Sequence, residues 1–440
     1  MHENNLLEIT THLVLQLAVI LFAAKIAAEI FVRYLKQPAV LGELIVGMIL
    51  GPYALGSLIP VPGMSEGLNT LFPLPNSMGG SHAVTVPVSN ELWVIGQIAV
   101  VILLFIAGLE TDLDQFIRYG FRALVIAIGG VIAPFLLGAY ATVAFGFAAS
   151  IMDPVSLFMG AIMTATSVGI TARVLSDIGK IATPEGVTIL AGAVVDDVLG
   201  ILVLAIVVSI SKAGAVSTSA IGLLALKAFG FWLGLTTVSI LMAKLIARAL
   251  EALKTEGASM TLALGLCFLI AAITELFGLA MIIGAYMIGL ALSNTEIAER
   301  LEESLRSIYH AFVPIFFVVM GMLVDFRAMQ SAILFGVVIS ILAIISKVFG
   351  CGIPALGVGF NMAGSFRIGI GMLPRGEVAL IIAGVGLASG VIDNTIFGVS
   401  IMMTFVTTLM APIILVPIFK RGGHGRRVQE SSDSDRRDEL

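Results

Sequence analysis

The sequence predicts a polytopic, all-α membrane protein with about thirteen transmembrane helices. Of its 440 residues, 58% are hydrophobic and only 12% are charged, whereas soluble domains have about 45–50% apolar and about 25% charged residues. Apolar stretches of about 20 residues, the length that crosses a bilayer as a helix, recur along the whole chain. Both cysteines, Cys267 and Cys351, lie inside such stretches. The spacing therefore indicates neither a disulfide framework nor a metal site.

Thirteen apolar windows lie between polar or turn-forming breaks, and we expect each of them to be a membrane span. The first follows an N-terminus, "MHENNLLEITTHLVLQ", that has no basic segment, so we expect a retained helix and not a cleaved signal. The expected spans are residues 7–31, 39–58, 92–109, 121–147, 154–174, 185–210, 219–249, 259–277, 279–293, 307–324, 331–356, 366–389 and 395–419.

The positions of the basic residues predict the orientation in the membrane. Of the 24 Lys and Arg residues, Lys25, Lys227 and Lys347 fall within spans and only Lys212 and Arg327 fall in connections on one side. We count the others with the opposite side, which includes the C-terminal tail. By the positive-inside rule the N-terminus is outside and the C-terminus is cytoplasmic, which requires an odd number of spans. The short connections favour the plasma membrane, the inner membrane of a bacterium.

Asp196 and Asp197 stand side by side in the middle of an apolar stretch, "LAGAVVDDVLGILVLAIV". An ionisable residue at mid-bilayer costs about 2.5–3.5 kcal/mol on insertion scales and therefore indicates a functional site. Successive helical residues point about 100° apart, so the two carboxylates face different neighbours. Lys347, the only charge deep within its span, is the candidate partner of Asp196, either as a proton-coupled pair or as a structural lock. Asp197 has no evident partner.

Polar or helix-breaking residues interrupt two other spans, within "MGAIMTATSVGITARVL" and "IGIGMLPRGEVALIIAGVG". These residues are Thr164, Thr166 and Ser167 in the fifth span, and Pro374, Arg375, Gly376 and Glu377 in the twelfth. Unwound backbone at membrane depth is tolerated where it is buried in protein or lines a cavity. We expect Arg375 and Glu377 to balance each other's charge.

The two interruptions lie seven spans apart, which predicts an inverted repeat. Because seven is odd, equivalent spans run in opposite directions, and paired interruptions of this kind indicate the binding site of a transporter. We expect residues 1–210 to form the first repeat, 211–258 a linker helix, 259–420 the second repeat and 421–440 a short cytoplasmic tail.

The residue types predict cation binding in competition with protons. Sodium is a hard cation that prefers oxygen ligands, which Asp197, the hydroxyl groups of Thr166 and Ser167 and freed backbone carbonyls supply. Burial favours the protonated form of a carboxyl group, so a proton competes for the same site. If only loaded states cross the membrane, exchange results. The sequence therefore predicts a secondary active antiporter that exchanges Na+, or Li+ or K+, for H+, and not an enzyme.

Three other classes of protein compare less well with the sequence. A cation channel is expected to carry a recognisable filter or ring, and a sodium-coupled solute symporter gives no reason for Lys347 opposite the aspartates. An intramembrane aspartyl protease needs its two aspartates on facing helices to share a proton. Adjacent positions on one helix do not allow that arrangement.

Six stretches, in one order over nearly the whole chain, carry a resemblance to a known family. They are "LGELIVGMILGP" (41–52), "LLFIAGLETDLD" (103–114), "TATSVGITARVL" (164–175), "GAVVDDVLGILVLA" (192–205), "FFVVMGMLVD" (316–325) and "LPRGEVALIIA" (373–383). In these stretches the chain resembles the monovalent cation:proton antiporter-2 family, and especially the bacterial NapA-type sodium/proton antiporters.

The resemblance implies a thirteen-helix antiporter fold, with a dimerisation domain, a mobile core domain and alternating access in a homodimer. It implies no cofactor beyond the transported cation and proton, and no nucleic-acid partner. By matching motif positions, it implies that Asp197 binds the ion and the proton and that Asp196 pairs with Lys347. The remaining matches are Thr166 and Ser167 beside the site, and Glu377 in the second broken helix.

The same resemblance separates two kinds of relative. An Asp-Asp pair with an intramembrane lysine is typical of electrogenic members, whereas glutathione-gated potassium efflux proteins carry a Gln-Asp pair and a large cytosolic nucleotide-binding domain. Here about twenty residues follow the last expected span. A K+/H+ antiporter or K+ efflux transporter without that domain is the nearest alternative to sodium/proton exchange.

Overall fold

The computed structural model describes residues 2–426, except 66–67, 75–86, 214–217, 254, 256, 326, 329–331 and 424. The described part is helical, with two isolated β-bridges, Pro60–Thr70 and Phe360–Arg426. Its helices are α1 (His2–Ile30), the π-helical turn η1 (Phe31–Leu35), α2 (Ala39–Leu50), α3 (Asn90–Leu109), α4 (Leu113–Ala144), α5 (Pro154–Thr164), α6 (Val168–Asp177), α7 (Pro184–Ala213), α8 (Thr218–Glu251), α9 (Ala258–Leu276), α10 (Met281–Ser293), α11 (Ala298–Met322), α12 (Ile333–Gly357), α13 (Met362–Gly371), α14 (Glu377–Ala388) and α15 (Asn394–Lys420).

The helices confirm the thirteen expected spans. Among the described residues, ten helical segments are long and apolar enough to cross a membrane, one of them made of α5 and α6 together. The shorter apolar helices α2, α10 and α14 lie in the second, ninth and twelfth expected spans. The fifth and twelfth spans are each divided into two half-helices, α5 and α6 in one and α13 and α14 in the other.

Several helix ends differ from the expected ones for local reasons. The second span was expected to run to residue 58, but α2 ends at Leu50 because the residue before Pro52 is extended. The fourth span was expected to begin at 121, but α4 begins at Leu113. The Asp112 side chain caps it there by accepting a 3.0 Å hydrogen bond from the Gln115 amide.

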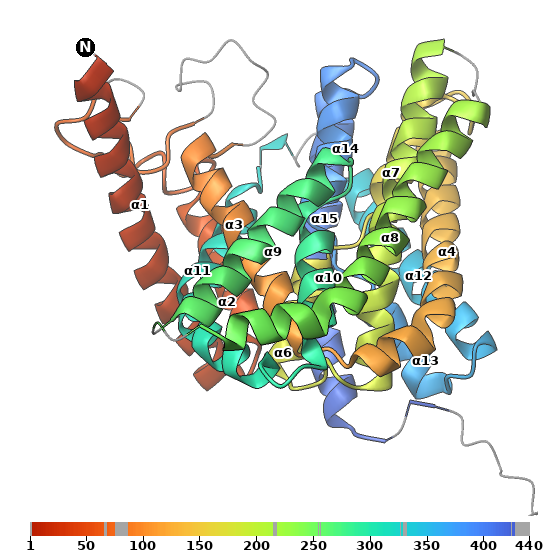
Figure 1. Cartoon of the computed structure of the whole chain (residues 1–440). Helices are drawn as coiled ribbons and strands as arrows, with labels where there is room; N and C mark the ends of the chain where they lie inside the picture. Colours follow the sequence, from red (N-terminus) through yellow and green to blue (C-terminus); the bar gives the residue numbers. More distant parts are fainter. Residues whose placement is uncertain are drawn as a thin grey trace, which may run out of the picture.

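The helices pack as two groups, which Figure 1 shows toward opposite sides of the molecule. We call the first group, α1, α2, α3, α9, α10 and α11, the panel. We call the second, α4 to α7 and α12 to α15, the site bundle. The helix α8 packs on α7, α9 and α10 and so connects them, while α6 packs on both α7 and the panel helix α3.

Close backbone contacts at glycines hold helices together within each group. In the panel, a Cβ atom on Gly108 of α3 would overlap the Tyr286 carbonyl oxygen of α10, and one on Gly289 would overlap the Phe105 carbonyl oxygen. In the site bundle, a Cβ atom on Gly350 of α12 would lie 2.7 Å from the Gly129 carbonyl oxygen of α4. Small residues at these positions allow the close approach that stabilises helix pairs in lipid.

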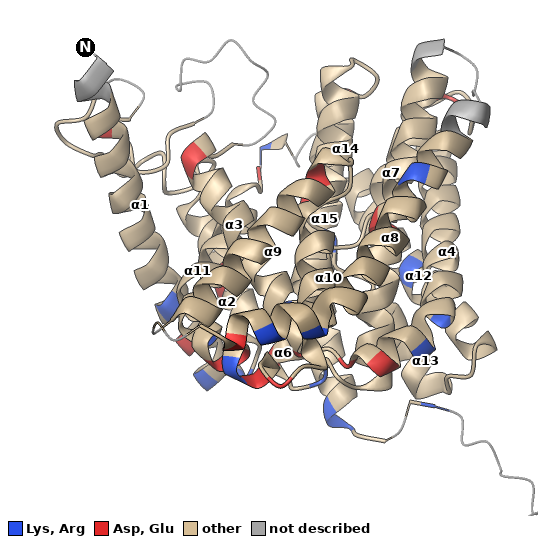
Figure 2. Ribbon diagram, viewed as in Figure 1, with Lys and Arg blue, Asp and Glu red and all other residues tan. Residues whose placement is uncertain are grey.

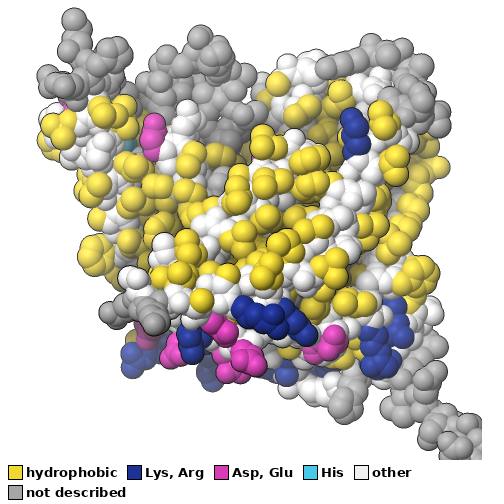
Figure 3. All heavy atoms as spheres, viewed as in Figure 1, with side chains coloured by type: hydrophobic (Ala, Val, Ile, Leu, Met, Phe, Trp, Pro, Cys, Tyr) yellow, Lys and Arg dark blue, Asp and Glu magenta, His cyan; other side chains and the backbone are white. Residues whose placement is uncertain are grey.

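The outer surface separates an apolar belt from a charged end. Most of the coloured Lys, Arg, Asp and Glu residues lie at the lower end in Figure 2, where α15 also ends. Above them, the face seen in Figure 3 is dominated by hydrophobic side chains. Large apolar residues of several helices are exposed, among them Leu226 and Leu241 of α8 and Leu276 of α9. This pattern is that of a protein whose middle faces lipid.

Candidate functional site: a crossing of two broken helices

The two broken spans meet at their extended segments, in the middle of the site bundle. The chain is non-helical between Thr164 and Val168 and again between Gly371 and Glu377. The Ser167 amide donates a 2.7 Å hydrogen bond to the Pro374 carbonyl oxygen, which joins the two breaks directly. Four half-helix ends therefore point at one small volume. Such ends leave backbone N–H and C=O groups free of intrahelical partners.

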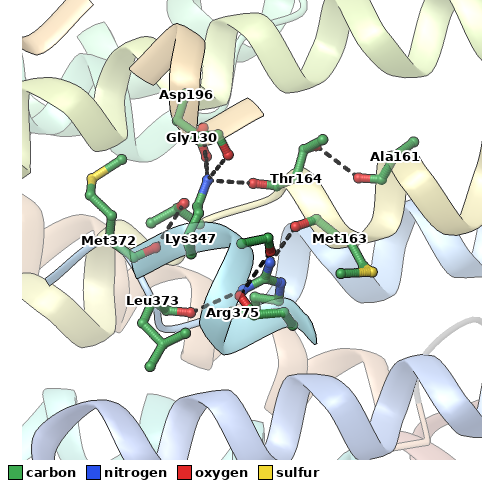
Figure 4. A network of polar contacts seen from close by, with 12 residues as sticks. Gly130, Ala161, Met163, Thr164, Asp196, Lys347, Met372, Leu373 and Arg375 are labelled. Carbon is green, nitrogen blue, oxygen red and sulfur yellow. Dashed lines mark hydrogen bonds and ion pairs between the residues drawn. The ribbon is translucent and has the colours of Figure 1, made fainter. Parts of the chain in front are cut away.

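Lys347 of α12 is fully buried and forms an ion pair with Asp196 of α7, as expected from the sequence. Its Nζ lies 3.1 Å from Asp196 Oδ1 and 3.3 Å from Oδ2. The same amine donates to the carbonyl oxygens of Gly130, at 2.8 Å, and Thr164, at 2.7 Å. Figure 4 shows these acceptors around the lysine. The pair therefore joins three helices of the site bundle, α4, α7 and α12, to the end of α5.

Arg375 does not balance Glu377, so the expectation of a pair between them is wrong. The described residues give Arg375 no ion pair. Its guanidinium donates to the Leu373 carbonyl oxygen at 3.2 Å and to the Met163 carbonyl oxygen (Figure 4). The Thr408 hydroxyl in turn donates to the Arg375 carbonyl oxygen. Breaking the helix creates free carbonyl groups nearby, and these take the place of the carboxylate partner.

Two positively charged side chains thus bind the C-terminal end of α5. Lys347 binds the Thr164 carbonyl oxygen and Arg375 binds the Met163 carbonyl oxygen. A helix C-terminus carries a partial negative charge that favours cations. The protein's own side chains therefore satisfy this end of the broken helix.

Asp197 differs from Asp196 in having no cation bound to it. Its side chain is buried, and its Oδ2 has no hydrogen-bond partner among the described residues. Ser167 Oγ and Glu377 Oε2 are likewise buried without a partner. Asp197 lies within electrostatic range of both Asp196 and Glu377. Gly376, next to Glu377, is so close to Ser167 that a Cβ atom there would lie 2.7 Å from Ser167 Oγ.

The threonines of the fifth span divide between local and distant contacts. The Thr164 hydroxyl bonds back to the Ala161 carbonyl oxygen at 2.8 Å, so only its carbonyl group faces Lys347. The Thr166 hydroxyl donates to the Met372 carbonyl oxygen at 3.3 Å and also lies within hydrogen-bonding range of Asp196. Thr171, which sequence reasoning did not select, donates to the Gly371 carbonyl oxygen at 2.8 Å. Its position five residues after Thr166, within the stretch "TATSVGITARVL", was the feature of the sequence that could have identified it.

The arrangement offers oxygen ligands to a monovalent cation. An ionised carboxylate without a partner is costly in buried surroundings, and a bound proton or cation removes that cost. Asp197, Glu377 and Ser167 supply the unpartnered oxygens. The described residues contain no group of three or more His, Cys, Asp and Glu side chains able to hold a metal ion.

Comparisons with known proteins show the family of the chain. The family model described as "Sodium/hydrogen exchanger, transmembrane" matches residues 18–421. A relative from Synechocystis sp., the "High-affinity Na(+)/H(+) antiporter NhaS3", is 36% identical, with 92% of this chain and 89% of that protein covered. The "Na(+)/H(+)-K(+) antiporter GerN" of Bacillus cereus is 35% identical, with 91% and 94% covered.

A solved structure shares the fold. The sodium proton antiporter MjNhaP1 from Methanocaldococcus jannaschii has a TM-score of 0.65 at 18% identity, covering 94% of this chain and 99% of that one. The structural match rests on the arrangement of helices, and the family match extends over both broken spans. The chain is a transporter and not an enzyme, and it belongs to the transmembrane sodium/hydrogen exchanger family.

Proposed function

We propose that the protein exchanges sodium ions for protons across the membrane by alternating access, with Asp197 as the group that binds either one. Asp197, Ser167 and Glu377 bind the cation, assisted by Thr166. A proton on Asp197 displaces the cation, so the two are never carried together. The observation that carries the proposal is the contrast between the adjacent aspartates. Asp196 is held by Lys347, whereas Asp197 Oδ2 has no hydrogen-bond partner within the part of the chain that the structure describes.

We infer that the exchange is electrogenic and that Lys347 takes part in the proton coupling. Lys347 has Asp196 and two backbone carbonyl oxygens as partners. If Asp196 turns toward an incoming cation, the ammonium group loses its only ionised partner and releases its proton. More than one proton then moves for each sodium ion, and net charge crosses the membrane.

Potassium is the second candidate cation. The name of the Bacillus cereus relative, an Na(+)/H(+)-K(+) antiporter, supports keeping potassium in the test. The ligands proposed here are oxygens, which bind either ion. Selectivity then depends on how closely Ser167, Asp197 and Glu377 can approach one another around the ion.

The wider organisation follows from the same proposal. The charged end holding the C-terminus of α15 faces the cytoplasm of a plasma membrane, and the N-terminus faces outside. Residues 1–210 and 259–420 are the two inverted repeats, with 211–258 as the linker and 421–440 as the tail. The exposed apolar side of α1, which includes Leu6, Phe22 and Ile26, supports a homodimer formed through the panel.

Proteoliposomes that contain a pH-sensitive dye test the proposed function. Pulses of sodium, lithium or potassium are expected to release protons in the order of cation selectivity, and the response is expected to disappear in Asp197→Asn. Clamping the membrane voltage with valinomycin and potassium decides electrogenicity, because an electroneutral exchanger does not respond to it. Thr237→Ala, an exposed threonine of α8 bonded only to its own helix, is the matched control.

Two results would contradict the proposal. Exchange that persists in Asp197→Asn would mean that another carboxylate binds the ions. A cation flux with no opposing proton movement in the wild-type protein would indicate a channel or a symporter instead.

A further inference from the structure

A second buried group of charges lies outside the site, at the boundary between the panel and the site bundle. Arg173 of α6 and Glu43 of α2 are 4% and 0% exposed, and their Nη2 and Oε1 atoms are 3.7 Å apart. Arg173 also binds Asp177, one turn further along α6, with Nε 3.0 Å from Oδ1. Its guanidinium carbon lies 5.1 Å from the centre of the Tyr309 ring of α11. Arg173 therefore joins a helix of the site bundle to two panel helices.

The contact across the boundary is only partly satisfied. Neither carboxylate oxygen of Glu43 has a hydrogen-bond partner among the described residues, and the same is true of Arg173 Nη1. A buried polar network made for rigidity satisfies all its members, because each unsatisfied group costs about 1–3 kcal/mol. A separation of 3.7 Å with free donors and acceptors on both sides suits a contact that breaks and forms again.

The Arg173–Glu43 pair lies between the charged end of the molecule and the candidate site. Arg173 is six residues beyond Ser167 on α6, a distance of about 9 Å along the helix. Between them, Gly169 faces Val100 and Leu103 of α3 and Phe316 of α11, so this part of the boundary is filled by apolar side chains.

On the other side of the pair, toward the charged end, lies a polar cavity of about 230 Å³. Its lining includes Glu110, Ser176, Asp177, Arg306, Tyr309 and His310. Tyr309 and Asp177 line the cavity and also contact Arg173, so the cavity lies next to the Arg173–Glu43 pair.

We propose that Arg173 and Glu43 form a latch between the site bundle and the panel, which closes the route from the charged end of the molecule to Asp197. The latch rests on the proposed exchange function, because it acts on the movement of the site bundle along the panel. As α6 moves, Arg173 leaves Glu43 and keeps Asp177, which travels on the same helix. Glu43 keeps Lys25 of α1 within electrostatic range. Each partner thus retains an opposite charge while the latch is open.

A two-state equilibrium gives the latch a measurable signature. A ligand that binds only one state has an apparent dissociation constant equal to the intrinsic one divided by the population of that state. Weakening the latch therefore increases the apparent sodium affinity at the charged end and decreases it at the opposite end. A merely structural defect has no reason to change the two affinities in opposite directions.

Sided membrane vesicles test this signature with Glu43→Gln and Arg173→Gln. For each variant we expect shifts in the apparent sodium constant of about threefold or more, in opposite directions on the two faces. Arg173→Lys, which keeps the charge, is expected to stay close to wild type. The matched control is Glu29→Gln, in which Arg33 of η1 loses its ion-pair partner on α1. We expect this control to leave the apparent sodium constant unchanged on both faces. Equal shifts on both faces, or none, would overturn the latch.

Labelling of a cysteine provides a readout that does not need transport. Leu103 is buried among the apolar side chains between the cavity and the site, and the native Cys267 and Cys351 are buried as well. Maleimide applied from the charged end is expected to label Leu103→Cys slowly, and at least about threefold faster when Glu43→Gln is added. Faster labelling without cation–proton exchange would keep the latch and reject the proposed function. Cation–proton exchange with unchanged labelling and unchanged affinities would keep the proposed function and reject the latch.

Discussion

Lys347 and Asp196 form a buried ion pair, with 3.1 Å between Nζ and Oδ1, that also holds the carbonyl end of a broken helix 183 residues away in sequence, through the Thr164 oxygen. The pair therefore serves the helix crossing as well as its own charge balance. Substitutions can distinguish the effect of the ion pair on stability from the effect of the carbonyl contacts of Lys347.

Removing Lys347 alone is expected to destabilise the protein strongly. Lys347→Ala leaves Asp196 as a buried charge without a partner, and breaking a buried pair in this way costs about 3–5 kcal/mol. Adding Asp196→Asn to the same chain removes the isolated charge and is expected to recover part of the loss. The detergent-solubilised thermal midpoints of the single and double variants measure this. A double variant no more stable than Lys347→Ala would show that the lost carbonyl contacts dominate.

Arg375→Lys is expected to impair the site although it keeps the charge. A lysine offers no planar fork that reaches both the Met163 and Leu373 carbonyl oxygens. The loss of one hydrogen bond from a charged group costs about 1.5–3 kcal/mol. We expect a lower thermal midpoint and a lower exchange rate, measured by the dye assay. Arg118→Lys, at an exposed position of α4 outside the site, tests whether any arginine replacement has this effect.

Gly376→Ala is expected to push the two broken spans apart. The added Cβ atom would lie 2.7 Å from Ser167 Oγ and 2.9 Å from Ser167 Cβ, so removing the hydroxyl alone gives no relief. Overpacking of this kind costs about 1–3 kcal/mol. We expect at least tenfold slower exchange with normal membrane insertion. Gly120→Ala on α4, where nothing lies within 4 Å, is the control for glycine substitution itself. Unchanged exchange in Gly376→Ala would show that the crossing is pliable.

Glu110, which follows α3 at the charged end, is expected to make stability depend on pH. Burial raises the pKa of Glu110 from 4.5 to about 7, although its hydrogen bond with Ser176 acts in the opposite direction. Between these values the folded protein binds a proton that the unfolded chain has released. This stabilisation is complete below about pH 4.5 and is lost as the pH rises through 7.

The corresponding test compares Glu110→Gln with wild type from pH 5 to pH 8. The difference is on the order of 3 kcal/mol at most, and the variant is expected to be the more stable one at pH 8 and nearly equal at pH 5. Thermal midpoints across the pH series measure it. Glu91→Gln, an exposed glutamate at the other end of α3, is expected to leave the wild-type slope unchanged.

The sequence allows prediction of those features of the fold and the site that depend on hydropathy and on isolated charges. The number of spans follows from apolar length, and Lys347 is identified because no other charge lies deep in its span. The position of Asp196 beside Lys347 follows from the need of each for an opposite charge. These inferences need no knowledge of which helices are neighbours.

The remaining features depend on contacts that no periodicity encodes. Arg375 binds the Met163 carbonyl oxygen, which is a free acceptor only because another span breaks, more than 200 residues earlier in the chain. Glu43 is fully buried because α6 of a distant span packs on α2. The helix α4 begins earlier than the expected residue 121 because a single aspartate, Asp112, caps it before its apolar stretch begins.

The cations fixed at the end of α5 also determine the electrical state of the site during transport. Lys347 and Arg375 contribute two formal positive charges, and Asp196, Asp197 and Glu377 contribute three negative ones. With Lys347 charged and one proton bound at Asp197, these groups sum to neutrality, whereas without the proton they carry one net negative charge. Carrying such a charge through surroundings of low polarity is costly. In the proposed exchange cycle the unloaded protein is therefore held back from reorienting, which prevents an uncoupled leak of ions.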